Sequence, residues 1–133
     1  MILVDSSVWI DYFRSAETPQ VALLDSLFGC VPLVVGDLIA VEVLQGIRSE
    51  REFRHVTRIF ASFRHIDIVD YELAVKAAQH YRVLRTIGIT VRKTIDVLIA
   101  ARCIEDGLTL LHADRDFLPF TKHFGLQVAY SEP

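Results

Sequence analysis

The chain has 133 residues, of which 52% are hydrophobic and 23% charged, and its formal net charge is −3. This length suits one domain, which we expect over residues 1–133, and the apolar share can bury a core without disulfides or a structural metal. The mild acidity argues against a protein that coats nucleic acid non-specifically, because that role requires a strongly basic face. It leaves open an enzyme that contacts nucleic acid locally.

Features that would direct the chain out of the cytoplasm are not evident in the sequence. Cys30 and Cys103 are far apart and fit no metal-ligand or redox spacing, so we expect buried, reduced thiols. Asp5 interrupts the first apolar residues and no basic region precedes them, which argues against a signal peptide. The longest apolar region, PLVVGDLIAVEVL, contains two acids and is shorter than the roughly 20 residues of a membrane span. We therefore expect a cytoplasmic protein without a membrane partner.

The predicted elements alternate between short apolar strands and longer helices. In chain order they are a strand at 2–4, helical turns at 8–14, a helix at 19–28, a strand at 31–35, a helix at 38–47, a helix at 49–63, a strand at 65–69, a helix at 71–87, a helix from 90 or 91 to 105, a strand at 108–112, a helical turn at 119–124 and a strand at 126–130. Thr18–Pro19 is typical of a helix start, and Asp37 and Asp70 are expected to be helix N-caps. This alternation predicts an α/β fold with a central, mostly parallel sheet and helices on both faces.

Four segments place acids at the edge of an apolar stretch. Asp5 lies within ILVDSSVWI, Glu42 within LIAVEVL and Asp96 within TIDVLIAARC, while Asp114 and Asp116 lie within ADRDF. In parallel α/β sheets, sites form outside the carboxyl ends of the strands. Because Asp5 and Asp114 each follow a predicted strand, we expect these two residues to share one site.

Each acid also has an ordinary structural explanation when it is taken alone. Asp5 suits a helix cap, Glu42 suits an outward position, Asp96 has Arg92 one turn earlier, and the acids of ADRDF suit a turn. Together they favour a shared site, because converging carboxylates repel one another unless cations lie between them. Mg²⁺ and Mn²⁺ take oxygen ligands of this kind, and such clusters support phosphoryl transfer.

With these residues identified, the chain resembles the PIN-domain ribonucleases, and among them the VapC-type toxins of prokaryotic toxin–antitoxin pairs. The resemblance rests on VDSSVWIDYF, LIAVEVLQG, DVLIAA and LLHADRDF, which stand in the family's order and at its spacing. It implies a PIN fold, a Mg²⁺- or Mn²⁺-dependent endoribonuclease, and a homodimer or a toxin–antitoxin hetero-oligomer. It also implies inhibition by a VapB-type antitoxin, for which a helix-in-groove contact is a reasonable expectation.

The resemblance also implies roles for individual residues. The acids that it assigns to catalysis and metal binding are Asp5, Glu42, Asp96, Asp114 and, as an accessory acid, Asp116. Ser6 or Ser7 matches the small hydroxyl residue that supports the first acid. His112 stands where many relatives have Thr, which puts a hydroxyl contribution at this position in doubt.

The candidate RNA contacts are Arg92, Lys93 and Arg115, because they neighbour the predicted metal ligands and phosphate contacts carry affinity. The arginines between residues 48 and 58 are interpreted instead as a solvated helix face that forms ion pairs with neighbouring glutamates. The aromatic residues of VWIDYF are interpreted as core or interface rather than as a surface for stacking RNA bases.

Two alternatives remain open. A phosphate-handling α/β domain of the receiver or haloacid-dehalogenase type fits poorly, since a phosphatase of that type would have Asp where Ser7 stands. A catalytically silent PIN-fold binding module would keep the fold, but it has no reason to retain costly charges in apolar surroundings.

Overall fold

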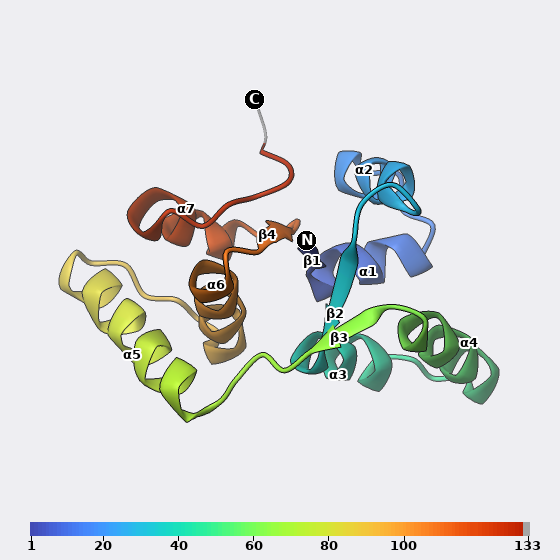
Figure 1. Ribbon diagram of the computed structural model, residues 1–133, viewed down its shortest axis with the longest axis horizontal. Helices are drawn as coiled ribbons and strands as arrows, with labels where there is room; N and C mark the ends of the chain where they lie inside the picture. Colours follow the sequence, from blue (N-terminus) through green and yellow to red (C-terminus); the bar gives the residue numbers. More distant parts are fainter. Residues whose placement is uncertain (132–133) are drawn as a thin grey trace.

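The computed structural model describes residues 1–131, and its central feature is a parallel β-sheet (Figure 1). Within these residues the sheet has four strands: β1 (Ile2–Val4), β2 (Leu33–Gly36), β3 (Arg64–Ile66) and β4 (Thr109–Leu111). Their spatial order is β3-β2-β1-β4, and each neighbouring pair is parallel. Parallel neighbours require crossover connections, which here are helical. The α/β architecture predicted from the sequence is confirmed.

Helices lie to either side of the sheet and make the connections (Figure 1). In the described chain they are α1 (Ser6–Phe13), α2 (Pro19–Leu27), α3 (Asp37–Gln45), α4 (Glu50–Ala61), α5 (Tyr71–Thr86), α6 (Thr94–Asp106) and α7 (Leu118–Phe124), with a 3₁₀ turn at Arg115–Phe117. As predicted, the Thr18 side chain caps α2 by accepting a hydrogen bond from the Val21 N–H at 3.0 Å. Asp70 caps α5 in the same way. None of the helices described is long and apolar enough to cross a membrane.

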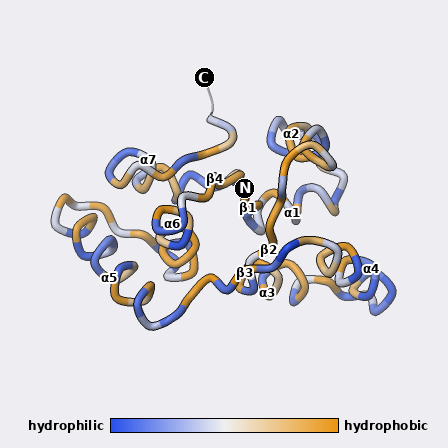
Figure 2. The backbone as a smooth tube through the Cα atoms, viewed as in Figure 1, coloured by the Kyte–Doolittle hydropathy of each residue, from blue (hydrophilic) through white to orange (hydrophobic). Residues whose placement is uncertain are grey.

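The core is formed by the strands and by the helix faces packed against them. Figure 2 shows apolar residues along β1, β2 and β4, and Leu3, Val34 and Leu110 on these strands are fully buried. Trp9 is also fully buried and contacts Phe60 with ring centroids 5.1 Å apart. Burying an aliphatic or aromatic side chain of this size contributes about 1.5–3 kcal/mol relative to leaving it exposed. Burial of Trp9 therefore fixes the position of α1 in the core. It also fixes the position of Asp5, which precedes the helix as its N-cap.

Asp37 differs from its predicted role as an N-cap. Gly36 occupies the cap position of α3, and Asp37 is the first residue of the helix. The Asp37 Oδ1 atom accepts hydrogen bonds from the N–H of Leu38 at 2.8 Å and of Ile68 at 3.0 Å. A Cβ at Gly36 would lie 2.6 Å from the Ile68 Cδ1 atom, so glycine permits this close approach. Asp37 thus connects α3 to the segment that follows β3.

Other boundaries also differ from those predicted. The expected strand at 126–130 is reduced to one parallel bridge between Val128 and Leu110. The third strand covers Arg64–Ile66 instead of 65–69, and α6 begins at Thr94. Cys103 is buried as expected, but Cys30 is exposed, since it lies after the end of α2 and outside the core.

Candidate metal centre

The predicted acids Asp5, Asp96, Asp114 and Asp116 lie near the carboxyl ends of β1 and of its neighbour β4, which is an edge strand. Asp5 directly follows β1, and its N–H donates a hydrogen bond of 2.9 Å to the carbonyl of Leu111, the last residue of β4. Asp96 lies in the first turn of α6. Carboxylate oxygens of Asp96, Asp114 and Asp116 all lie within 4.8 Å of one another. Segments that are far apart in sequence therefore contribute to one acidic cluster.

Asp5 is 2% exposed, and its two carboxylate oxygens have different surroundings. Its Oδ2 atom accepts hydrogen bonds from the Ser7 N–H at 3.1 Å and the Ser7 hydroxyl at 2.6 Å, so Asp5 also caps α1. Ser7 Oγ in turn accepts a hydrogen bond from the Ala113 N–H at 3.1 Å. The Asp5 Oδ1 atom is buried and has no hydrogen-bond partner among residues 1–131. Desolvation by burial raises the pKa of Asp5.

Glu42 lies on α3, is half-buried, and is oriented by the other serine. The Ser6 hydroxyl donates a hydrogen bond of 3.0 Å to Glu42 Oε1. Burial raises the pKa of Glu42, and the nearby charge of Asp5 raises it further. The two adjacent serines thus support two different acids, a division that the sequence left open because no local signal pairs Ser6 with a residue 36 positions away.

Asp96 is buried, and burial raises its pKa to about 7. The ion pair with Arg92, which was the ordinary alternative explanation for Asp96, is absent from the described structure. Instead, the Lys93 Nζ atom lies 3.9 Å from Asp96 Oδ2 and 3.7 Å from Asp114 Oδ2, and Arg92 lies 3.5 Å from Asp116 Oδ2. The spacing of three residues between Lys93 and Asp96 is a signal that could have revealed this contact. Two of the candidate RNA contacts therefore act as counter-ions of the cluster in this structure.

The turn after β4 holds the remaining acids. Asp114 caps the 3₁₀ turn, because its Oδ1 atom accepts a hydrogen bond from the Asp116 N–H at 2.9 Å. His112 is buried, and burial lowers its pKa, which favours the neutral imidazole. Its Nδ1 atom accepts a hydrogen bond from the Asp114 N–H at 3.2 Å. Arg115 is exposed and forms no ion pair within the described chain.

The donor set of this cluster suits a hard divalent cation. Asp5 Oδ1, Asp96 Oδ2 and Asp116 Oδ2 are buried oxygens that lack hydrogen-bond partners in the part of the chain described. Leaving a buried polar group unsatisfied costs about 1–3 kcal/mol, and more for a charged group. Mg²⁺ and Mn²⁺ take carboxylate oxygens as ligands, whereas zinc sites favour Cys and His. The residues present therefore fit a Mg²⁺ or Mn²⁺ ion.

Residues 2–121 match the pattern that defines the PIN domain. The chain belongs to the PIN domain family. This PIN domain is 30% identical over 131 residues to ribonuclease VapC11 of Mycobacterium tuberculosis, and the match covers 97% of this chain and 98% of that protein.

Solved structures agree with the fold. VapBC2 from Rickettsia felis, solved bound to a DNA fragment from its promoter, superposes with a TM-score of 0.75 at 16% identity, covering 96% of this chain and 97% of that chain. A toxin–antitoxin complex from Klebsiella pneumoniae superposes with a TM-score of 0.68 at 18% identity, covering 98% and 97% of the two chains. At these identities the structures bear on the fold alone, and they confirm the PIN fold that the resemblance implied.

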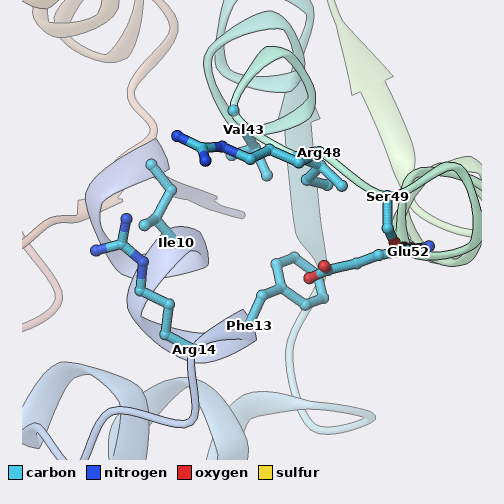
Figure 3. Close-up of a pocket in the computed structure, with 9 residues that line it drawn as sticks. Ile10, Phe13, Arg14, Val43, Arg48, Ser49 and Glu52 are labelled. Atoms are coloured by element: carbon cyan, nitrogen blue, oxygen red, sulfur yellow. Dashed lines mark hydrogen bonds between the residues drawn. The ribbon is translucent and has the colours of Figure 1, made fainter.

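A separate hollow of about 400 Å³ lies between α1, α3 and α4 of this PIN domain. Figure 3 shows Ile10, Phe13 and Val43 along its apolar walls, with Arg14 and Arg48 extending beside them. It contains none of the acids of the candidate metal centre. Its apolar walls lie beside two guanidinium groups and one carboxylate, that of Glu52.

Proposed function

We propose that this chain is a Mg²⁺- or Mn²⁺-dependent endoribonuclease toxin that hydrolyses RNA phosphodiester bonds. The observation that carries the proposal is the convergence of Asp96, Asp114 and Asp116 within 4.8 Å, beside a buried Asp5 with one unpartnered oxygen. Converging buried carboxylates are costly unless cations compensate them. The likeness to ribonuclease VapC11, at 30% identity along 97% of the chain, supports RNA as the substrate.

The three aspartates of the cluster, with Asp5 beside them, would hold the cation, which would offset charge on the phosphate and increase the acidity of the attacking water. The chain's own side chains orient the reaction. The Ser7 hydroxyl donates a hydrogen bond to Asp5 and accepts one from the Ala113 N–H, so it holds the turn after β4 next to Asp5. Ser6 holds Glu42 at the rim, where its carboxylate can accept a proton from the water. None of these acids is required as a covalent nucleophile.

Positive charge beside the cluster provides contacts for the RNA backbone. Arg115 is exposed. The Arg92 side chain contacts Asp116, yet 80% of its surface is exposed to solvent. Once the acids bind a divalent cation, Arg92 and Lys93 lose their role as counter-ions and can contact phosphate. Guanidinium groups are well suited to this, because their donors match the geometry of phosphate oxygens.

We also propose that residues 1–133 act as one PIN domain. We further propose that a VapB-type antitoxin inhibits this domain in a toxin–antitoxin hetero-oligomer. The toxin–antitoxin complex from Klebsiella pneumoniae has this fold, which supports the partner class. The hollow of Figure 3, with Arg14 and Arg48 beside apolar walls, offers a surface for an amphipathic antitoxin segment.

The experiment that tests the proposal combines cleavage with metal binding. Wild-type protein is expected to cleave RNA with Mg²⁺ or Mn²⁺, to lose this activity in EDTA, and to unfold at a higher temperature when Mn²⁺ is added. The Asp96→Asn variant is expected to lose both cleavage and the Mn²⁺ effect. Asp25→Asn, which changes an exposed acid on α2, is the matched control and should retain both. Cleavage by Asp96→Asn at the wild-type rate would refute the site.

The silent binding module predicts a different pattern. A module of that kind would show no cleavage of any RNA and no rise in Tm with Mn²⁺, while still binding its partner protein. The buried Oδ1 atom of Asp5, which has no hydrogen-bond partner in the described chain, favours the enzyme, because a module that binds no cation would keep this cost without a use for it.

A further inference from the structure

A second hollow, of about 280 Å³, borders the acidic cluster and shares Asp114 with it. Its walls come from α2, from the turn after β4, from α7 and from the segment that follows α7. The residues that line it include Gln20, His112, Arg115, Leu118, Thr121 and Tyr130. Any ligand bound here would therefore lie directly beside the proposed reaction centre.

The hollow combines apolar walls with polar groups that have no partner. Leu118 is 54% exposed, and Val128 and Tyr130 are half-buried beside it. Thr121 Oγ1 and His112 Nε2 are shielded from solvent and have no hydrogen-bond partner in the described chain. His112 Nδ1 accepts a hydrogen bond from the Asp114 N–H, whereas its Nε2 atom has no such contact in the described chain. This lining suits a flat ligand with apolar faces and hydrogen-bonding edges.

The charges around the hollow favour a nucleotide. Arg115 lines it and is exposed, whereas Asp114 is the one acid among the described residues that line it and belongs to the cluster that would hold the cation. A phosphate held near Arg115 and the cation would direct the base attached to its sugar toward the adjoining walls. Nucleobases present both stacking faces and polar edges, and Tyr130 and Thr121 offer contacts of both kinds.

We propose that this hollow binds a nucleobase next to the cleaved phosphodiester, with Tyr130 and Leu118 against the base and Thr121 and Gln20 at its edges. The proposal rests on the proposed ribonuclease function and deepens it, because it makes this hollow the source of base preference. A base stacked on an aromatic side chain gains about 5- to 150-fold in affinity. A side chain of a protein partner is the competing occupant, and it predicts a loss of affinity for an antitoxin peptide instead of a change in KM.

The test crosses variants of the hollow with RNA oligonucleotides that each lack one base near the cleavage site. For wild-type protein, one abasic position is expected to raise KM by about 5- to 150-fold. Tyr130→Ala should raise KM for intact RNA by a similar factor, and the same abasic position should then add less than twofold. Thr121→Val should weaken binding of some bases more than others. The kcat and the Mn²⁺-induced rise in Tm should not change.

Two controls keep the result interpretable. Tyr130→Phe retains the ring and is expected to keep the wild-type KM, which separates loss of stacking from loss of folding. Tyr71→Ala removes a tyrosine that is 84% exposed on α5 and distant in sequence from the hollow, and it should leave KM unchanged. Wild-type KM values for both Tyr130→Ala and Thr121→Val would overturn the inference. It would also be overturned if the abasic position raised the KM of Tyr130→Ala by the same factor as it raises the KM of wild type.

The failures of the two proposals differ. If wild-type protein cleaves RNA and gains stability from Mn²⁺ but the hollow variants keep their KM, only the nucleobase site is wrong. If those variants lose affinity for an antitoxin peptide while KM stays constant, the hollow belongs to a protein partner and the inference is also overturned. If wild-type protein neither cleaves nor responds to Mn²⁺, the proposed function itself fails.

Discussion

Replacing Asp96 with Asn should stabilise the metal-free protein at neutral and alkaline pH. A pKa of about 7 in place of 3.8 corresponds to about 4 kcal/mol of destabilisation when the carboxylate is fully ionised, since a tenfold change in acidity is worth about 1.4 kcal/mol. The side chain is 5% exposed, so solvent does little to screen this cost. The buried amide of Asn still needs hydrogen bonds, which removes about half of the gain. We therefore expect about 2 kcal/mol, or roughly 6–10 °C in Tm.

The sign of the pH dependence follows from the direction of the pKa shift. Because the pKa of Asp96 is raised in the folded protein, the native state binds more protons than the unfolded state between about pH 4 and pH 7. The contribution of Asp96 to stability therefore falls as pH rises through this window. Asn does not titrate, so the variant should be about 2 kcal/mol less stable than wild type near pH 4, where only the cost of its amide counts, and about 2 kcal/mol more stable above pH 7.

Urea unfolding in EDTA at pH 5 and pH 8 measures this difference, with Asp25→Asn as the control that removes a charge at an exposed position. Saturating Mn²⁺ should reverse the order of stabilities, because the cation compensates the carboxylate in wild type and has one ligand fewer in the variant. A variant that is less stable than wild type at pH 8 in EDTA, or a difference that does not depend on pH, would refute the reasoning.

Three further outcomes are expected. Lys93→Met should lower metal-free stability by up to about 1 kcal/mol and tighten Mn²⁺ binding in calorimetric titration, because the ammonium group competes for Asp96; unchanged Mn²⁺ affinity would contradict this. Ser7→Ala should cost about 1–2 kcal/mol and lower kcat at saturating Mn²⁺, since Asp5 loses its hydroxyl partner; a loss of stability with full activity would limit Ser7 to a structural role. Asp37→Ala should cost about 1–3 kcal/mol in urea unfolding, because the Ile68 N–H loses its acceptor, and RNA cleavage by the folded variant should remain at the wild-type rate.

Local pattern was enough to predict the class of fold and the main candidates for the site. Short apolar strands alternating with helices indicated a parallel α/β sheet, and caps such as Thr18 and Asp70 act within three residues of their own position. Acids that follow strands could be expected at one sheet edge, because parallel strands end on the same side. These features depend on periodicity and on neighbours along the chain, which the sequence displays directly.

Contacts between distant segments were decided only by the tertiary structure. Placing β1 beside β4 brings Asp5 next to a turn more than 100 residues later, and the Ser7–Ala113 hydrogen bond depends on that placement. The same packing brings the Ser6 hydroxyl within hydrogen-bond distance of Glu42. It also places the Lys93 ammonium group beside Asp96 and Asp114. Strand order and helix packing arise from burial summed over the whole core, and no local stretch of sequence contains that sum. The residue types of the candidate site are therefore evident in the sequence, whereas their partners follow from the fold.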